Sequence, residues 1–151
     1  MQPLLIFGYG NPSRGDDAIG PLLIERLEAM NLPQVELMTD FQLQIENALD
    51  LRGREWVLFV DASYSCPAPF AMNRVQPLRD ASYTSHTMSP AAVLHACFEL
   101  YGERPECWLL EVKGDSFELG EELSTRAREY LILAYHEALK FCVKHVSPDL
   151  F

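Results

Sequence analysis

Residues 4–20 read LLIFGYGNPSRGDDAIG, and this stretch shows which class of fold to expect. The apolar run over residues 4–7 is typical of a short strand that is buried on both faces of a sheet. A glycine-rich turn follows and leads into residues 21–30, where apolar side chains recur at helical spacing. A buried strand that turns directly into a helix is the opening unit of an α/β sheet.

The rest of the chain continues this alternation. Further strands are expected over residues 35–38, 56–60, 70–76 and 107–112, the third of these at an edge of the sheet. Further helices are expected over residues 42–51, after Ser89-Pro90, and from about Glu121 onward. The order predicts one three-layer α/β domain over residues 1–151, with a mostly parallel, twisted sheet of about five strands and helices on both faces, of the phosphorylase/hydrolase-like type.

Composition excludes several classes of function. The chain has 22 acidic and 12 basic residues, a formal net charge of −10, which argues against a nucleic-acid partner. No apolar stretch approaches the roughly 20 residues of a membrane-spanning helix, and the N-terminus does not resemble a signal peptide. We therefore expect a cytoplasmic protein that does not contact a membrane. The four cysteines form no C-x-x-C pair, which excludes zinc-ribbon and thioredoxin-like motifs.

The glycines of the first turn do not form a nucleotide-binding motif. Gly8, Gly10 and Gly15 have the spacing G-x-G-x4-G, which is neither the dinucleotide fingerprint nor the phosphate-binding loop, and no lysine follows them. The turn ends instead in Asp16 and Asp17, which would repel a phosphate but attract a metal ion. We interpret Asp16 as a residue that caps the following helix or is solvated.

A metal site is predicted at one edge of the sheet. Asp17 follows the first strand, Asp61 is expected to terminate the strand over residues 56–60, and His86 lies in a polar loop ahead of a helix. In an open α/β sheet, sites form beyond the carboxyl ends of the strands, so these side chains can meet there. Two carboxylates and one imidazole suit zinc, nickel or manganese, and three protein ligands leave coordination positions open for chemistry.

These motifs resemble one known family. The residues that carry the resemblance are Gly8-x-Gly10-Asn11, Asp16-Asp17-Ala18-Ile19-Gly20, Val60-Asp61-Ala62, His86, Gly114-Asp115-x-Phe117 and Gly120-x-x-Leu123-Ser124. In this order they are similar to the hydrogenase maturation endopeptidases, cytoplasmic proteases that trim the C-terminus of the large subunit of [NiFe] hydrogenases after nickel has been inserted. The pair Gln42-Leu43 looks closer to the branch that serves bidirectional, NAD-coupled hydrogenases.

The resemblance implies a role for each candidate residue. Asp17, Asp61 and His86 would be both the metal ligands and the catalytic residues, although many relatives have Glu at the position of Asp17. The metal would be nickel carried by the substrate, with no organic cofactor. The partner would be a hydrogenase large-subunit precursor, and the protein is expected to be a monomer.

Substrate contacts are expected at Gly10, Asn11 and Asp40, where a tight turn would let the substrate backbone approach. The catalytic step stays open, because a metal could polarise the scissile carbonyl or a carboxylate could act as the base.

Two alternative functions remain. A non-catalytic nickel-sensing or assembly protein of the same pathway could use the same three side chains. Peptidyl-tRNA hydrolases have an opening strand and turn that look like residues 7–12. That family, however, places a histidine and an asparagine before its helix and needs a basic surface, whereas this chain has Asp16-Asp17 and a net charge of −10.

Overall fold

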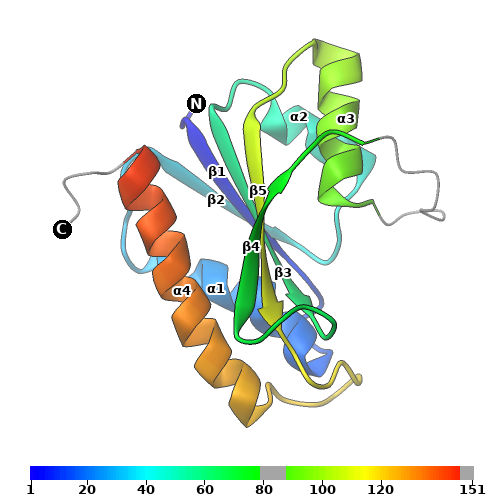
Figure 1. Cartoon of the computed structure of the whole chain (residues 1–151), viewed down its shortest axis with the longest axis vertical. Helices are drawn as coiled ribbons and strands as arrows, with labels where there is room; N and C mark the ends of the chain where they lie inside the picture. Colours follow the sequence, from blue (N-terminus) through cyan, green and yellow to red (C-terminus); the bar gives the residue numbers. More distant parts are fainter. Residues whose placement is uncertain (79–87, 147–151) are drawn as a thin grey trace.

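The computed structural model describes residues 1–78 and 88–146. Five strands alternate with helices along the chain (Figure 1). The strands are β1 (Leu4–Tyr9), β2 (Val35–Asp40), β3 (Trp56–Ser63), β4 (Phe70–Val75) and β5 (Glu106–Lys113). The α-helices are α1 (Ile19–Glu28), α2 (Ala48–Leu51), α3 (Pro90–Tyr101) and α4 (Thr125–His145), and short 3-10 helices cover Gly15–Ala18 and Ile45–Asn47.

The strands form one sheet in the order β2-β1-β3-β5-β4. All neighbours are parallel except β4, which pairs antiparallel with β5 at the edge. The chain leaves β1 for β2 on one side and then crosses to β3 on the other. The sheet order therefore reverses at β1 and β3, and in open α/β sheets ligands bind outside the carboxyl ends of the strands at this switch point. The expected five-stranded, mostly parallel sheet is confirmed, and the strand predicted over residues 70–76 lies at its edge as β4 (Phe70–Val75).

Helices cover both faces of the sheet, with α1 and α4 on one side and α2 and α3 on the other (Figure 1). Successive side chains of β1 alternate between the two layers: Leu4 and Ile6 pack toward α1 and α4, whereas Leu5 and Phe7 pack toward α2. Every residue of β1 is buried, as its continuous apolar sequence predicts. The three-layer architecture is thus confirmed.

Two helices are shorter than expected. The helix predicted over residues 42–51 reduces to a 3-10 turn and the single turn of α2, because Leu43 is fully buried and a reciprocal capping box between Gln44 and Asn47 begins the helical segment. The last helix begins at Thr125 rather than near residue 121, because Ser124 caps it by accepting a hydrogen bond from the Ala127 N–H. Within the described residues, no helix is both long and apolar enough to cross a membrane.

Candidate functional site

The turn between β1 and α1 is built to hold Asp17. The Asn11 N–H donates to Asp17 Oδ2 at 2.6 Å, and Asn11 Oδ1 accepts from the Ser13 N–H at 2.9 Å. Gly10 has a φ of 151°, and a Cβ at this position would lie 2.0 Å from the carbonyl oxygen of Asp17. The space beside Gly10 is therefore occupied by the chain's own backbone, so packing within the turn is enough to explain why this residue is glycine.

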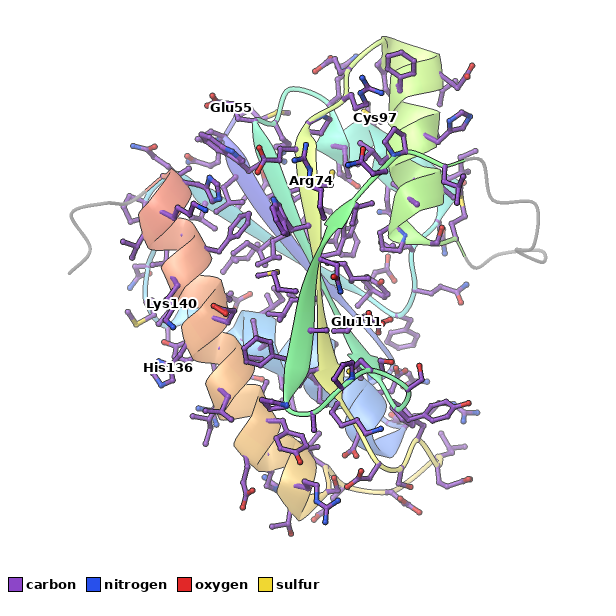
Figure 2. The ribbon with its side chains drawn as sticks, viewed as in Figure 1. Glu55, Arg74, Cys97, Glu111, His136 and Lys140 are labelled. Carbon is purple, nitrogen blue, oxygen red and sulfur yellow. The ribbon has the colours of Figure 1, made fainter. Side chains whose placement is uncertain are left out.

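Asp61 lies inside β3 rather than at its end, because β3 continues to Ser63 alongside β5. Its Oδ1 accepts a hydrogen bond from the Ala62 N–H at 2.8 Å. Its neighbour on β5 is Glu111, whose side chain lies on the side of the sheet that faces α3 (Figure 2). On β1 the buried Tyr9 forms a side-chain hydrogen bond with Asp61. Three adjacent strands thus contribute Tyr9, Asp61 and Glu111 to one row.

This arrangement changes the pKa of Asp61 and of Tyr9. Burial, the charge of Asp17 and the charge of Glu111 raise the pKa of Asp61 to about 7, against the opposing effect of its hydrogen bonds. Burial and the charge of Asp61 raise the pKa of Tyr9 well above its ordinary value. The Tyr9 hydroxyl therefore stays protonated and donates a hydrogen bond to the Asp61 carboxylate. At neutral pH, Asp61 can exist in both protonation states, which is the condition for a group that accepts and returns a proton.

Asp17 and Asp61 line the same open hollow, which has a volume of about 350 Å³. Part of its lining is aromatic: the rings of Tyr64 and Phe117 lie 6.0 Å apart, edge to face. The remaining lining residues are Ala62, Ser63 and Ser65. The structure therefore brings together two of the three predicted metal ligands at the switch point of the sheet.

The third predicted ligand, His86, lies outside the described residues. Over residues 1–78 and 88–146 no three His, Cys, Asp or Glu side chains are grouped so that they could hold a metal ion. The metal site of Asp17, Asp61 and His86 therefore stays a prediction. The two carboxylates do supply oxygen ligands of the kind that divalent metals bind.

A second hollow, of about 310 Å³, lies on the side of the turn nearer β2. Its lining residues are Gly10, Pro12, Pro21, Thr39, Asp40 and Phe41. The Asp40 carbonyl accepts a hydrogen bond from the Gly10 N–H at 3.0 Å, and its carboxylate accepts one from the Phe41 N–H at 2.6 Å. Gly10 and Asp40, two of the residues expected to contact substrate, thus line one hollow. Asn11, the third, shapes the turn.

Asp16 does not have the role that its sequence position indicates. It is fully buried and does not cap α1, whose N-cap is Ala18 without a side-chain bond. Its Oδ2 accepts hydrogen bonds from the N–H groups of Asp115 and Ser116, at 2.7 and 3.2 Å. Both the N–H and the hydroxyl of Ser124 also donate to this carboxylate, at 2.7 and 2.8 Å.

These bonds join the β1–α1 turn to residues 114–124, the loop that carries Phe117, and they add to backbone hydrogen bonds between Gly15 and Glu121 and between Ser13 and Gly120. Burial raises the pKa of Asp16, but the four hydrogen bonds together outweigh it and hold the pKa below its ordinary value. The carboxylate is therefore charged, and its charge is satisfied by donors rather than by a cation.

Sequence reasoning missed Tyr9, Glu111 and Tyr64 as parts of this site. Glu111 did have a signal, because it is an acidic residue near the carboxyl end of a predicted buried strand, like Asp61. Tyr9 stands between Gly8 and Gly10 at the end of the first strand, and this local sequence does not indicate that its side chain belongs to a site. Tyr64 shows no local signal, since its place in the site depends on two loops that meet only in the folded chain.

No protein-family model matches the chain, and no curated protein matches it. Solved structures do match it over nearly its whole length. The crystal structure of the [NiFe] hydrogenase maturation protease HycI from Thermococcus kodakarensis is 25% identical, with 95% of this chain and 94% of that chain covered and a TM-score of 0.71.

The hydrogenase maturating endopeptidase HybD from E. coli is 24% identical, with 95% and 93% covered and a TM-score of 0.75. The endopeptidase HycI from E. coli is 19% identical, with 88% and 86% covered and a TM-score of 0.66. These likenesses confirm the resemblance that the sequence motifs indicate.

Proposed function

We propose that this chain, which has the fold of the hydrogenase maturation proteases, is an endopeptidase that removes the C-terminal extension of the nickel-loaded large-subunit precursor of a [NiFe] hydrogenase. One observation carries the proposal: Asp17 and Asp61 share an open hollow at the switch point of a sheet whose solved relatives are maturation proteases. We infer that the protein acts in the cytoplasm, as a monomer, on the folded precursor.

The nickel belongs to the substrate in this proposal. Asp17 and Asp61 each have one carboxylate oxygen fixed by a backbone N–H, which holds both groups in a defined orientation toward the hollow. Together with His86 they would contact the nickel and thereby test whether insertion has taken place. Oxygen ligands from two carboxylates and nitrogen from one imidazole suit this ion. Cleavage would follow only when the ion brings the scissile bond into the hollow.

Asp61 is the best candidate for moving protons during hydrolysis. Burial raises the pKa of Asp61 to about 7 in the free protein, whereas contact with the substrate nickel would lower it, so the group would meet the substrate as a charged carboxylate. This carboxylate would take a proton from the attacking water, and the proton would then pass to the departing amine. Tyr9, which donates to the same carboxylate, would keep it in place. The substrate nickel can contribute by polarising the scissile carbonyl. Neither step needs a serine or cysteine nucleophile.

Mass spectrometry of the intact precursor tests this function. The large-subunit precursor of the same organism is loaded with nickel, incubated with the protein and weighed. We expect wild type and the control Asp115→Asn, an exposed carboxylate outside the hollow, to release one defined C-terminal peptide. Asp17→Asn, Asp61→Asn and His86→Ala should each slow release at least about 100-fold, the usual scale for loss of an acid–base group.

Two outcomes would contradict the proposal. If Asp17→Asn and Asp61→Asn cut as fast as the control, the chemistry does not occur in this hollow. If wild type binds the nickel-loaded precursor but leaves it uncut, the chain is a non-catalytic nickel sensor.

A further inference from the structure

Among the described residues, two Phe or Tyr side chains are far more exposed to solvent than the others. Tyr64 is 71% exposed and Phe41 is 65% exposed, whereas the next, Phe98, is 44% exposed. Single exposed apolar side chains are common on protein surfaces and carry no argument alone. These two, however, lie on opposite sides of the same turn: Tyr64 lines the hollow of Asp17 and Asp61, and Phe41 lines the hollow of Gly10 and Asp40.

The turn over residues 10–17 separates the two hollows and is held rigidly. Gly10 packs on the backbone of Asp17, Asn11 bonds to the Asp17 carboxylate, and Asp16 ties the end of the turn to residues 114–124. The backbone that carries the two aromatic rings is also anchored. Phe41 follows directly on β2, and the Tyr64 carbonyl accepts a hydrogen bond from Lys113 Nζ. Within the described residues, the backbone of this surface is therefore in place before a ligand binds.

The distance between the hollows can be worked out from the register of the sheet. Tyr9 of β1 pairs with Asp40 of β2, and Gly8 pairs with Val60, the residue before Asp61. Asp40 and Asp61 therefore lie two strand spacings apart, or roughly 10 Å. An extended peptide rises about 3.3 Å per residue, so roughly three residues cross the turn.

We propose that an extended segment of the precursor crosses the turn over residues 10–17, with the cleaved bond in the hollow of Asp17 and Asp61 and a second residue in the hollow of Asp40. Apolar side chains of this segment pack on Tyr64 and Phe117 at one end and on Phe41 at the other. The inference rests on the proposed function and adds to it a path for the substrate and a requirement for apolar residues about three positions apart. The occupant is the segment around the cleaved bond, because one hollow contains the candidate catalytic carboxylates.

Kinetics of the aromatic variants test this path. Phe41→Ala and Tyr64→Ala should each raise KM for the nickel-loaded precursor about tenfold, the effect of removing a central contact residue, and should leave kcat within about twofold. Phe98→Ala, which removes an exposed aromatic ring on α3, should change neither constant. Unchanged KM in the first two variants, with cleavage by wild type intact, would overturn the path but not the protease.

Cross-linking places the substrate independently of turnover. A photoreactive p-benzoylphenylalanine at position 64 should capture precursor residues at the cleaved bond, and one at position 41 should capture residues about three positions away, while one at position 98 should capture none. Capture of the same precursor residue from both positions, or of none, would overturn the path. If the precursor binds and cross-links in this pattern but is not cut, the result supports the substrate path and contradicts the protease function. If the precursor is neither bound nor cut, the result contradicts both the path and the protease function.

Discussion

Replacing Asp16 by asparagine separates the charge of this buried carboxylate from its shape. The change adds no volume, so it leaves the surrounding packing in place. It converts one acceptor oxygen into an NH₂ group, which can only donate. Asp16 Oδ2 accepts three hydrogen bonds and Oδ1 accepts one, from the Ser124 N–H. The least harmful orientation of the new side-chain amide would keep its oxygen toward the three donors and turn its NH₂ group toward the Ser124 N–H.

The loss of stability in Asp16→Asn can be estimated from these hydrogen bonds. One hydrogen bond to a charged acceptor is lost, which is worth about 1.5–3 kcal/mol, and two donors are left facing each other in a buried place. The three remaining bonds weaken because their acceptor is no longer charged. We therefore expect Asp16→Asn to lower the free energy of unfolding by about 3 kcal/mol near neutral pH. Asp115→Asn removes the same charge from an exposed position one residue from Ser116 and should cost less than about 0.5 kcal/mol.

Denaturant unfolding measured at several pH values checks both the size of this stability loss and the direction in which it changes with pH. The pKa of Asp16 is lowered in the folded state, so its contribution is present above the unfolded pKa of about 3.9 and is lost as the pH falls through the folded pKa. The difference in the free energy of unfolding between wild type and Asp16→Asn should thus become smaller at acidic pH. Amide exchange at Asp115, Ser116 and Ser124 should speed up in the variant. A loss of stability no larger than that of Asp115→Asn would refute the reasoning.

Three further outcomes follow from the same contacts. Because burial and neighbouring charge raise the pKa of Asp61 to about 7, wild type should lose stability relative to Asp61→Asn between about pH 4 and 7, and denaturation should show the balance shift toward the variant by up to about 4 kcal/mol between pH 4 and pH 8. An equal difference in unfolding free energy between wild type and Asp61→Asn at pH 4 and at pH 8 would contradict this. A Cβ at Gly10 would lie 2.0 Å from a backbone carbonyl oxygen, so thermal unfolding should show Gly10→Ala to be destabilised by at least about 3 kcal/mol. Gly102→Ala meets no atom within 4 Å and should cost about 1 kcal/mol, from its φ of 70° alone. Ser124 caps α4 and also bonds to the buried carboxylate, so Ser124→Ala should cost about 2 kcal/mol. Ser89→Ala should cost about 1 kcal/mol, because within the described residues the Ser89 side chain caps α3 and forms no second bond; equal losses would show that the second bond of Ser124 contributes nothing.

The sheet could be predicted because its strands have strong local signals. Residues 4–7 and 56–60 are continuous apolar runs, and only a strand buried on both faces, or a buried helix segment, explains such a run. Short helices are harder, because burial of Leu43 and the capping box at Gln44 outweigh the helical spacing of residues 42–51. The proximity of Asp17 and Asp61 could be predicted from the sequence, because both come near the carboxyl end of a strand and these ends lie at the same edge of a parallel sheet.

The role of Asp16 could not be predicted by local reasoning. An acidic residue at the start of a helix normally interacts with that helix, and the partners of Asp16 lie about 100 residues later in the chain. The same holds for Tyr64 and Phe117, whose rings meet only after β3 and β5 have paired. Sequence shows where chemically active residues lie along the chain, but tertiary contacts decide which of them face a common hollow.

The most direct test of the central claim compares two forms of one substrate. The large-subunit precursor, nickel-loaded or nickel-free, is incubated with wild-type protein, and the intact mass of each form is measured over time. We predict the loss of a single C-terminal peptide from the nickel-loaded precursor, with the nickel-free form unchanged. An unchanged mass of the nickel-loaded precursor would contradict the protease, and equal cleavage of both forms would contradict recognition of the substrate nickel by Asp17, Asp61 and His86.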